Sequence, residues 1–217
     1  MSTDRGLQAS FFDMGNDVSD QPAEDHDLKN LTGIGAIYEP GFLTEAECEH
    51  LLNAIDAQEE HWMTGLQRRV QHFGWKYDYS SRGTGERADP VPDFILPIAE
   101  KLRERGWFSS VPDQVIINEY EPGQGIGAHA DRDCFGPAVA MLSLADRWPM
   151  QFEPAGRHTS KGERLELFLD VGSILVLTGE VRNKWVHSIV RRKTDGQGPA
   201  KRKRERRVSV TFRTIND

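Results

Sequence analysis

The residues with the clearest chemistry are two histidines and an aspartate. His129 and Asp131 are two positions apart in a segment that we expect to be a strand, so their side chains point to the same face. His187 lies in WVHSIV, on a second predicted strand. Two imidazoles and one carboxylate bind Fe(II) in non-haem oxygenases and leave other coordination positions open. The spacing therefore predicts a metal site, with a hydrolytic zinc site as the competing assignment.

Two arginines near the end of the sequence favour iron over zinc. Arg207 and Arg213 are six positions apart in RVSVTFR, so on a strand they share a face with Ser209 and Thr211. At ~3.3 Å per residue their Cα atoms lie roughly 20 Å apart, a gap that two extended side chains could close around a small dicarboxylate. A guanidinium binds a carboxylate through two parallel hydrogen bonds. A hydrolytic zinc site has no need of such a pair, so we expect iron with a dicarboxylate cosubstrate.

These side chains need strands to position them, and the second half of the chain is rich in predicted strands. They cover residues 113–120, 139–144, 164–170, 173–179, 185–190 and 208–214. Predicted helices over 43–58, with Thr44 near its start, and over 92–107 precede most of them. Helices followed by a run of strands predict an α+β domain whose second half is a small barrel or jelly roll.

Two irregular segments lie close to the candidate site. Gly123, Gly125 and Gly127 precede His129 and let the backbone turn tightly and approach its neighbours closely. Residues from about 66 to 90 read as a hairpin or flap, aromatic early and rich in glycine and proline late. Its aromatic residues alternate with polar ones; they are Phe73, Trp75, Tyr77 and Tyr79. They could cover a ligand or simply bury one face of a hairpin.

Size and composition fit one domain. The 217 residues, 37% of them hydrophobic, suffice for one full core, and we expect it over 31–217 after a flexible N-terminal arm at 1–30. No apolar run approaches the ~18 residues that span a bilayer, and the first residues do not read as a secretory signal. Cys48 and Cys134 read as reduced thiols. We therefore expect a cytoplasmic monomer with no membrane contact.

The distribution of charge suggests a polyanionic partner. The net charge is −7, but residues 191–207 hold nine of the 27 basic residues and two of the 34 acidic ones. The rest of the chain therefore carries 18 basic and 32 acidic residues. A cationic loop on an acidic body can direct a polyanion to one place. The alternative is a loop that is merely solvated.

Taken together, these motifs resemble the AlkB family of Fe(II)/2-oxoglutarate-dependent dioxygenases from about residue 66 to 215. The resemblance implies a double-stranded β-helix core flanked by N-terminal helices and the aromatic flap, with Fe(II), 2-oxoglutarate and O2 as cofactor and cosubstrates. It implies iron binding by His129, Asp131 and His187. It also implies 2-oxoglutarate contacts by Asn118, Tyr120, Arg207 at the distal carboxylate, and Arg213 near the iron end and Asp131.

The resemblance also suggests a substrate. Asp133 stands where repair members carry the acidic residue that reads the flipped base, and Tyr77 and Tyr79 match the lid tyrosines. A carboxylate and aromatic faces suit the cationic N1-methyladenine and N3-methylcytosine. We therefore expect oxidative demethylation of alkylated bases in single-stranded DNA or RNA. One alternative is a tRNA-modifying hydroxylase, because the stretch DQVIINEYEPGQGI resembles that branch of the family. The other is an inactive nucleic-acid-binding module. Ser209 and Leu177 depart from residues that some members carry.

Overall fold

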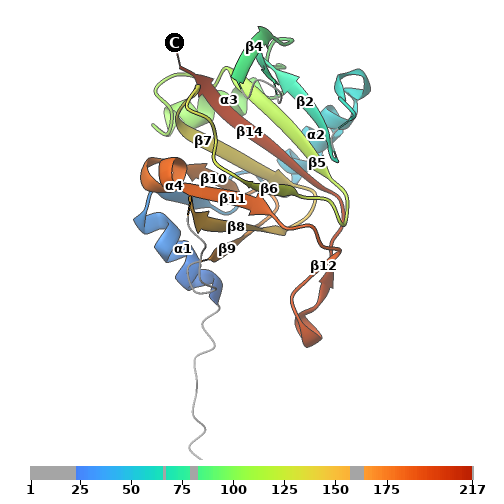
Figure 1. The fold of residues 1–217 in the computed structure, drawn as a ribbon. Coiled ribbons are helices and arrows are strands. Elements are labelled where there is room, and N and C mark those ends of the chain that lie inside the picture. Colours follow the sequence, from blue (N-terminus) through green and yellow to red (C-terminus); the bar gives the residue numbers. More distant parts are fainter. Residues whose placement is uncertain (1–22, 66, 79–82, 157–163, 217) are drawn as a thin grey trace, which may run out of the picture.

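The core consists of two antiparallel sheets that lie one above the other (Figure 1). A computed structural model describes residues 23–65, 67–78, 83–156 and 164–216. The larger sheet has the order β1 (Ala36–Glu39), β10 (Ile174–Leu177), β7 (Phe135–Leu144), β14 (Arg207–Ile215), β5 (Gln114–Tyr120) and β2 (Arg69–Phe73). The smaller has the order β6 (Ile126–His129), β11 (Trp185–Ile189), β8 (Trp148–Pro154) and β9 (Leu165–Leu169). This is the expected double-stranded β-helix.

Helices α2 (Glu45–Asp56) and α3 (Leu96–Glu104) cover the outer face of the larger sheet. The helix starts after Thr44, as predicted, and it begins with a capping box: the Glu47 amide donates to the Thr44 hydroxyl at 3.3 Å, and the Thr44 amide donates to the Glu47 carboxylate at 2.7 Å. Leu51 and Ile55 of α2 then pack into the same core as the apolar residues of β5 and β14. The two helices thus bury the apolar residues on the outer face of the larger sheet, and the inner face remains available for polar side chains.

Strand β14 shows how the alternation in the sequence divides the two faces. Val208, Val210 and Phe212 belong to the core beneath the helices. The residues between them face the space between the sheets; they are Arg207, Ser209, Thr211 and Arg213. Pairing of β14 with both β5 and β7 places it inside the larger sheet. The prediction that both arginines lie on one face of one strand is therefore confirmed.

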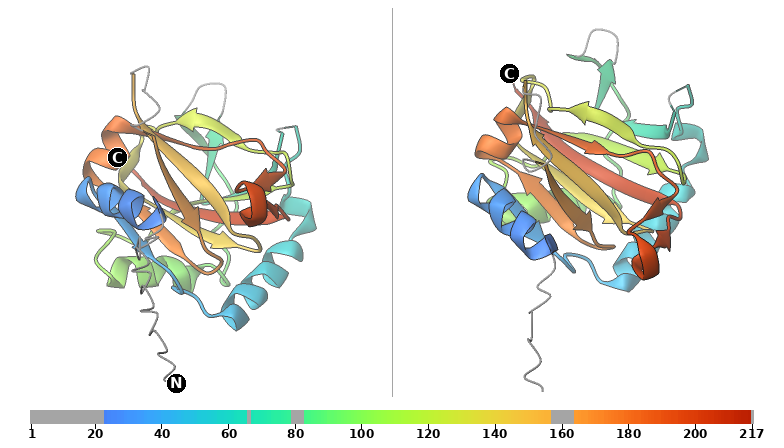
Figure 2. Two further views of the ribbon diagram at one scale, coloured as in Figure 1. Left: turned by 90° about the horizontal axis from the view of Figure 1, so that it is seen from below. Right: turned by 60° about the horizontal axis from the view of Figure 1, so that its bottom comes forward.

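Two of the longer elements were not predicted. Helix α1 (Ala23–Gly33) includes residues 23–30 of the predicted arm, and it packs on β9, where the Glu166 amide donates to Asp27 Oδ2 at 2.9 Å (Figure 2). Residues 1–22 lie outside the described residues. Strand β8 reads WPMQFEP, whose two prolines obscured it in the sequence. No helix in the described ranges is long and apolar enough to cross a membrane.

The remaining elements are short. The predicted flap contains β3 (Trp75–Asp78) and β4 (Gly83–Arg87), which pair with each other. The basic segment contains β12 (Thr194–Asp195) and β13 (Arg202–Lys203), which form a small hairpin. Helix α4 (Gly179–Lys184) leads directly into β11.

Candidate active site

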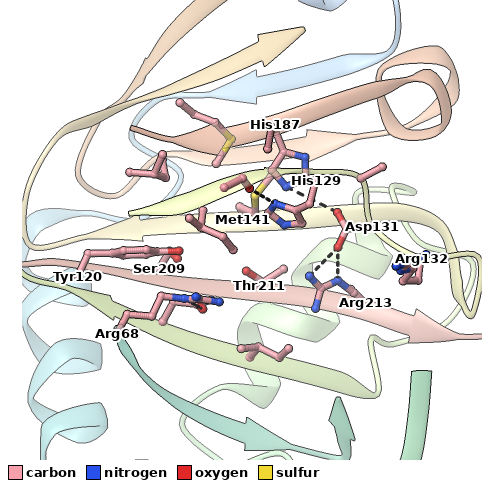
Figure 3. A pocket seen from close by; sticks show the side chains of 18 of the residues that line it. Arg68, Tyr120, His129, Asp131, Arg132, Met141, His187, Ser209, Thr211 and Arg213 are labelled. Carbon is pink, nitrogen blue, oxygen red and sulfur yellow. Dashed lines mark hydrogen bonds and ion pairs between the residues drawn. The ribbon is translucent and has the colours of Figure 1, made fainter. Parts of the chain in front are cut away.

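A cavity of about 630 Å³ lies between the two sheets. Its walls come from β5 and β14 of the larger sheet and from β6 and β11 of the smaller one. Figure 3 shows His129, His187, Asp131 and Arg213 toward one end of this cavity and Tyr120, Ser209 and Arg68 toward the other. The cavity therefore has two chemically different ends.

Pairing of two strands brings the two histidines together. His129 on β6 is the register partner of His187 on β11, and the ring centroids are 4.5 Å apart. The close approach depends on Gly125, because a Cβ atom there would lie 2.2 Å from the Ile189 carbonyl oxygen on β11. The predicted role of this glycine is thus confirmed, whereas Gly127 has no atom within 4 Å of a Cβ position.

Asp131 reaches the histidines from beyond the end of its strand. Strand β6 ends at His129, so the prediction that one strand carries both residues is wrong. The chain leaves the sheet there, and Asp131 is held in place by Arg213, which donates to Oδ1 from Nε at 2.8 Å and from Nη2 at 2.6 Å. The other oxygen, Oδ2, is buried without a hydrogen-bond partner and lies 3.8 Å from His187 Nε2.

The three donors fit a metal ion in type, burial and protonation. An unpartnered buried carboxylate oxygen is costly unless something binds it. The His129 Nδ1 atom lies 2.8 Å from the Gly127 carbonyl oxygen, which can only accept, so Nδ1 carries the hydrogen and Nε2 keeps its lone pair. Among the described residues no group of three such side chains is preassembled to hold an ion, so small side-chain rotations would have to close the set. His129 is the least buried of the three.

The electrostatics of the site keep these donors ready for a cation. Burial, reinforced by the neighbouring His129, lowers the pKa of His187 to about 3. Burial also lowers the pKa of His129. Both rings are therefore neutral at neutral pH. Burial opposes ionisation of Asp131, but the surrounding groups, Arg213 first among them, together outweigh burial, so the pKa of this carboxyl is lowered.

Arg182 on α4 holds the backbone of Asp131, and sequence reasoning missed it. Its side chain is buried, and it donates to the Asp131 carbonyl from Nη1 at 2.9 Å and to the Arg132 carbonyl from Nη2 at 2.8 Å. Because α4 leads into β11, one guanidinium connects the Asp131 turn to the strand that carries His187. No sequence signal distinguishes this arginine from a surface residue.

The other end of the cavity contains a buried cation. Arg207 is 1% exposed, and it donates from Nη2 to the Ser143 hydroxyl at 3.0 Å, while its Nε atom has no partner. Burial lowers its pKa to about 10, so it stays charged at neutral pH. Arg213, in contrast, is already occupied by Asp131 and by Gln114 Oε1 at 3.1 Å. The two arginines are therefore not the symmetrical clamp that their spacing suggested: Arg207 alone of the two is free to take an anion.

Asn118 and Tyr120 lie on β5 beside Arg207. Tyr120 is buried, and its ring centroid is 5.6 Å from the Arg207 Cζ atom. Asn118 accepts a hydrogen bond on Oδ1 from Arg68 Nε at 2.8 Å. Arg68 itself lines the cavity and was also missed. The one sequence feature that could have indicated a role for Arg68 is its position in RRV, next to the start of a strand.

The structure brings fewer of the substrate-binding candidates to the cavity. Asp133 is exposed and does not line the cavity, and its carbonyl accepts from Asn216 Nδ2 at 2.7 Å. Tyr77 pairs with Thr84 through the backbone, but its side chain lies outside what the structure describes, and Tyr79 lies outside the described residues altogether. The base contacts of these three residues therefore stay predictions.

The other two flap aromatics have structural partners. Phe73 is 1% exposed within the core. The Trp75 indole donates to Asp113 Oδ2 at 3.2 Å, and the Arg87 Cζ atom lies 3.8 Å from the centre of its ring. Of the two interpretations of these aromatics, burial of a hairpin face is the one that fits Phe73.

The basic segment is less cationic than its sequence suggests. Five of its nine basic residues are withdrawn from the surface. Four form ion pairs within the protein: Arg192, Arg202 and Arg204 with Asp195, and Arg206 with Asp56 and Glu119. The fifth, Arg207, is buried in the cavity wall. The other four are exposed: Arg191, Lys193, Lys201 and Lys203. A polyanion would therefore meet four exposed cations here, and not nine.

Comparison with known proteins identifies the family. The family model for the 2OG-Fe(II) oxygenase superfamily matches residues 35–213. An Arabidopsis thaliana protein named alkylated DNA repair protein ALKBH8 homolog is 33% identical over 210 residues, which cover 87% of this chain and 60% of that protein. The Mus musculus tRNA (carboxymethyluridine(34)-5-O)-methyltransferase ALKBH8 is 35% identical over 163 residues, 70% of this chain and 24% of that one. The chain thus spans less than two thirds of these relatives.

Solved structures show the same fold. The structure of OsALKBH1 superimposes with a TM-score of 0.61 at 20% identity, covering 83% of this chain and 96% of that one. A Pseudomonas putida prolyl-4-hydroxylase gives a TM-score of 0.56 at 17% identity, covering 88% and 98%. With the family match and the sequence relatives, the conclusion is that this chain belongs to the AlkB family of the 2OG-Fe(II) oxygenase superfamily.

Proposed function

We propose that this protein is an Fe(II)- and 2-oxoglutarate-dependent dioxygenase that oxidatively demethylates N-alkylated bases, N1-methyladenine and N3-methylcytosine, in single-stranded DNA or RNA. One observation supports the chemistry most directly. A single cavity holds an unpartnered buried carboxylate oxygen of Asp131 and an unpartnered buried guanidinium nitrogen of Arg207. The first suits a cation and the second an anion. An inactive binding module would gain nothing from either, since each destabilises the fold when left unpaired.

Each residue has a defined role in this proposal. His129, Asp131 and His187 would hold Fe(II), which with 2-oxoglutarate and O2 supplies oxidation of a C–H bond. Arg213 keeps Asp131 ionised and fixes the direction in which Oδ2 points. Arg207 would bind the distal carboxylate of 2-oxoglutarate. The rest of the cavity would then remain for the group that is oxidised.

The cavity wall also limits the entry of water. Met141, Met150, Ile116 and Ile189 line it, and the two methionines are buried. Apolar side chains around the reacting centre strengthen the electrostatic interactions inside it and suppress side reactions. An N-methyl group that is hydroxylated in such a site leaves as formaldehyde and releases the repaired base.

The exposed cations support a nucleic-acid partner. Lys193 lies against the turn that leads into β6, because its Cγ and Cε atoms are 3.6 Å from a Cβ position at Gly123. Arg191 lies next to Gly125 in the same way, with Cγ 3.1 Å from a Cβ position. Phosphate contacts at these residues would position a strand beside β6, which carries His129.

A second candidate is hydroxylation of a tRNA base without demethylation. The observation in its favour is the charge of the cavity wall. Arg68 and Arg132 line the wall, whereas Asp133 does not. A wall with arginines favours a neutral base over a cationic one.

Formaldehyde release separates the candidates. The Fe(II)-loaded protein should release formaldehyde from oligonucleotides that contain N1-methyladenine or N3-methylcytosine. No release from either, together with oxidation of a tRNA, would replace the first candidate by the second. Iron-dependent conversion of 2-oxoglutarate to succinate tests the shared chemistry, and Asp131→Ala should abolish it. Activity that survives this substitution would refute the ligand assignment.

A further inference from the structure

Four arginines line the cavity. One of them, Arg132, is exposed and lies near Asp131. The other three differ in how their charges are compensated. Arg213 is paired with Asp131. Arg207 and Arg68 have no carboxylate partner among the described residues: Arg207 donates to the Ser143 hydroxyl and Arg68 to the Asn118 side-chain carbonyl. Figure 3 shows Arg68 near Tyr120, at the end of the cavity away from the proposed metal ligands. Arg207 lies at the same tyrosine, so two uncompensated cations remain at this end.

Both cations lie at the same side chain. The Cζ atom of Arg68 is 5.8 Å from the centre of the Tyr120 ring, and the Cζ atom of Arg207 is 5.6 Å from it. Two positive charges in a partly enclosed space repel each other. An anion placed between them would relieve this repulsion and would accept hydrogen bonds from both guanidinium groups.

Strand register explains why Arg68, and not its neighbour, faces the cavity. Strand β2 pairs with β5 so that Arg69 lies opposite Glu119 and Val70 opposite Asn118. Arg69 accordingly pairs with Glu119 on the outer face, with Nε 2.5 Å from Oε1. One position earlier, Arg68 is directed to the opposite face, where Asn118 and Tyr120 point. The pattern thus gives one inward and one outward arginine.

We propose that Arg68 is a second binding group for the distal carboxylate of 2-oxoglutarate, opposite Arg207. The proposal rests on the use of 2-oxoglutarate inferred above. Arg207 is buried at the base of this end, while Arg68 is half-buried and enters from the segment that precedes β2. The carboxylate would bind Arg207 from inside and be covered by Arg68 from the rim. Arg68 would thereby select a dicarboxylate over a 2-oxo acid with an uncharged end.

The test compares two 2-oxo acids of equal length. Calorimetry with the Mn(II)-loaded protein, which does not turn over, measures the Kd of 2-oxoglutarate and of 2-oxopentanoate, in which a methyl group replaces the distal carboxylate. Loss of a hydrogen bond to a charged group should make the Kd of 2-oxoglutarate about tenfold to a hundredfold weaker in Arg68→Ala. The Kd of 2-oxopentanoate should stay the same.

Three controls keep the result specific. Arg69→Ala removes the outward arginine and should leave both Kd values unchanged. Arg68→Lys keeps the charge and should lose less affinity for 2-oxoglutarate than Arg68→Ala. Thermal unfolding should show that all three variants fold.

The proposal is overturned if Arg68→Ala binds 2-oxoglutarate within about twofold of the wild type, or if it loses affinity for both acids equally. It is also overturned if only oligonucleotide affinity, measured with saturating 2-oxoglutarate, decreases, because Arg68 would then contact the substrate. A wild-type protein that does not prefer 2-oxoglutarate over 2-oxopentanoate would refute the cosubstrate itself, which is a different outcome.

Discussion

Replacing Arg182 with methionine should weaken metal binding as well as the fold. The guanidinium holds the carbonyl groups of Asp131 and Arg132 at 2.9 Å and 2.8 Å, and it reaches the Phe135 carbonyl at 3.4 Å. These carbonyls belong to the turn that carries one proposed metal ligand, Asp131, and α4 leads into the strand that carries another, His187. Without Arg182 the two ligands lose their common support.

The magnitude follows from the two short hydrogen bonds. A hydrogen bond to a charged group stabilises a protein by about 1.5–3 kcal/mol. The gain is offset in part, because the buried Arg182 leaves its Nε atom without a partner and methionine packs well in an apolar space. We expect a net loss of about 2–3 kcal/mol in the free energy of unfolding, or roughly 5–10 °C in Tm. Residues that orient metal ligands contribute about tenfold to a hundredfold in metal affinity.

Two measurements test this reasoning. Calorimetry gives the Kd for Mn(II), and thermal unfolding of the metal-free protein gives Tm. Arg204→Met is the matched control, since the Arg204 side chain is equally inaccessible but pairs with Asp195 outside the cavity. It should lower Tm and leave the Mn(II) affinity intact. If Arg182→Met lowers Tm while binding Mn(II) as tightly as the wild type, Arg213 alone positions Asp131 and the reasoning is refuted.

Further predictions concern the contacts around the site. Gly125→Ala should lower Tm by several degrees, because its Cβ would collide with a carbonyl of β11, whereas Gly127→Ala should leave Tm unchanged in the same scan. Asp195→Asn should cost about 3–5 kcal/mol in urea unfolding at pH 7, because it leaves the buried Arg204 unpaired. Burial raises the pKa of Asp195, but Arg204 and Arg192 outweigh it and lower the pKa. Its stabilisation is therefore fully present above the carboxyl's ordinary pKa of about 4 and is lost as the pH falls through the lowered pKa of the folded state; a difference between wild type and Asp195→Asn that does not shrink as the pH falls below about 4 would contradict this.

Local patterns in the sequence predicted the framework of the site. Val208, Val210 and Phe212 alternate with four cavity residues on β14, and alternation depends only on the geometry of a strand. The start of α2 at Thr44 likewise depends on contacts within one turn of helix. Such features can be read from a sequence because they do not depend on which distant segment packs beside them.

Contacts between distant segments could not be predicted in the same way. Arg206 looked like one more cation in a basic run, yet it pairs with Asp56, 150 positions earlier. Arg182 resembled a surface residue until the fold placed the Asp131 carbonyl beside it. The sequence shows that a charge exists, but only the tertiary structure shows whether another charge or a carbonyl compensates it. For this reason the run at 191–207 overstated the cationic surface.

The two ends of the cavity differ in charge, because the arginines at each end have different partners. At the end that holds the proposed metal ligands, Arg213 is neutralised by Asp131, so this end attracts a cation through the free carboxylate oxygen. At the other end, Arg207 and Arg68 have no acidic partner in the described part of the chain. A 2-oxo dicarboxylate entering this field would place its distal carboxylate at the two arginines and its 2-oxo acid group at the metal ligands. The same arginine type therefore serves opposite purposes at the two ends, and the difference lies in which carboxylate the fold places beside it.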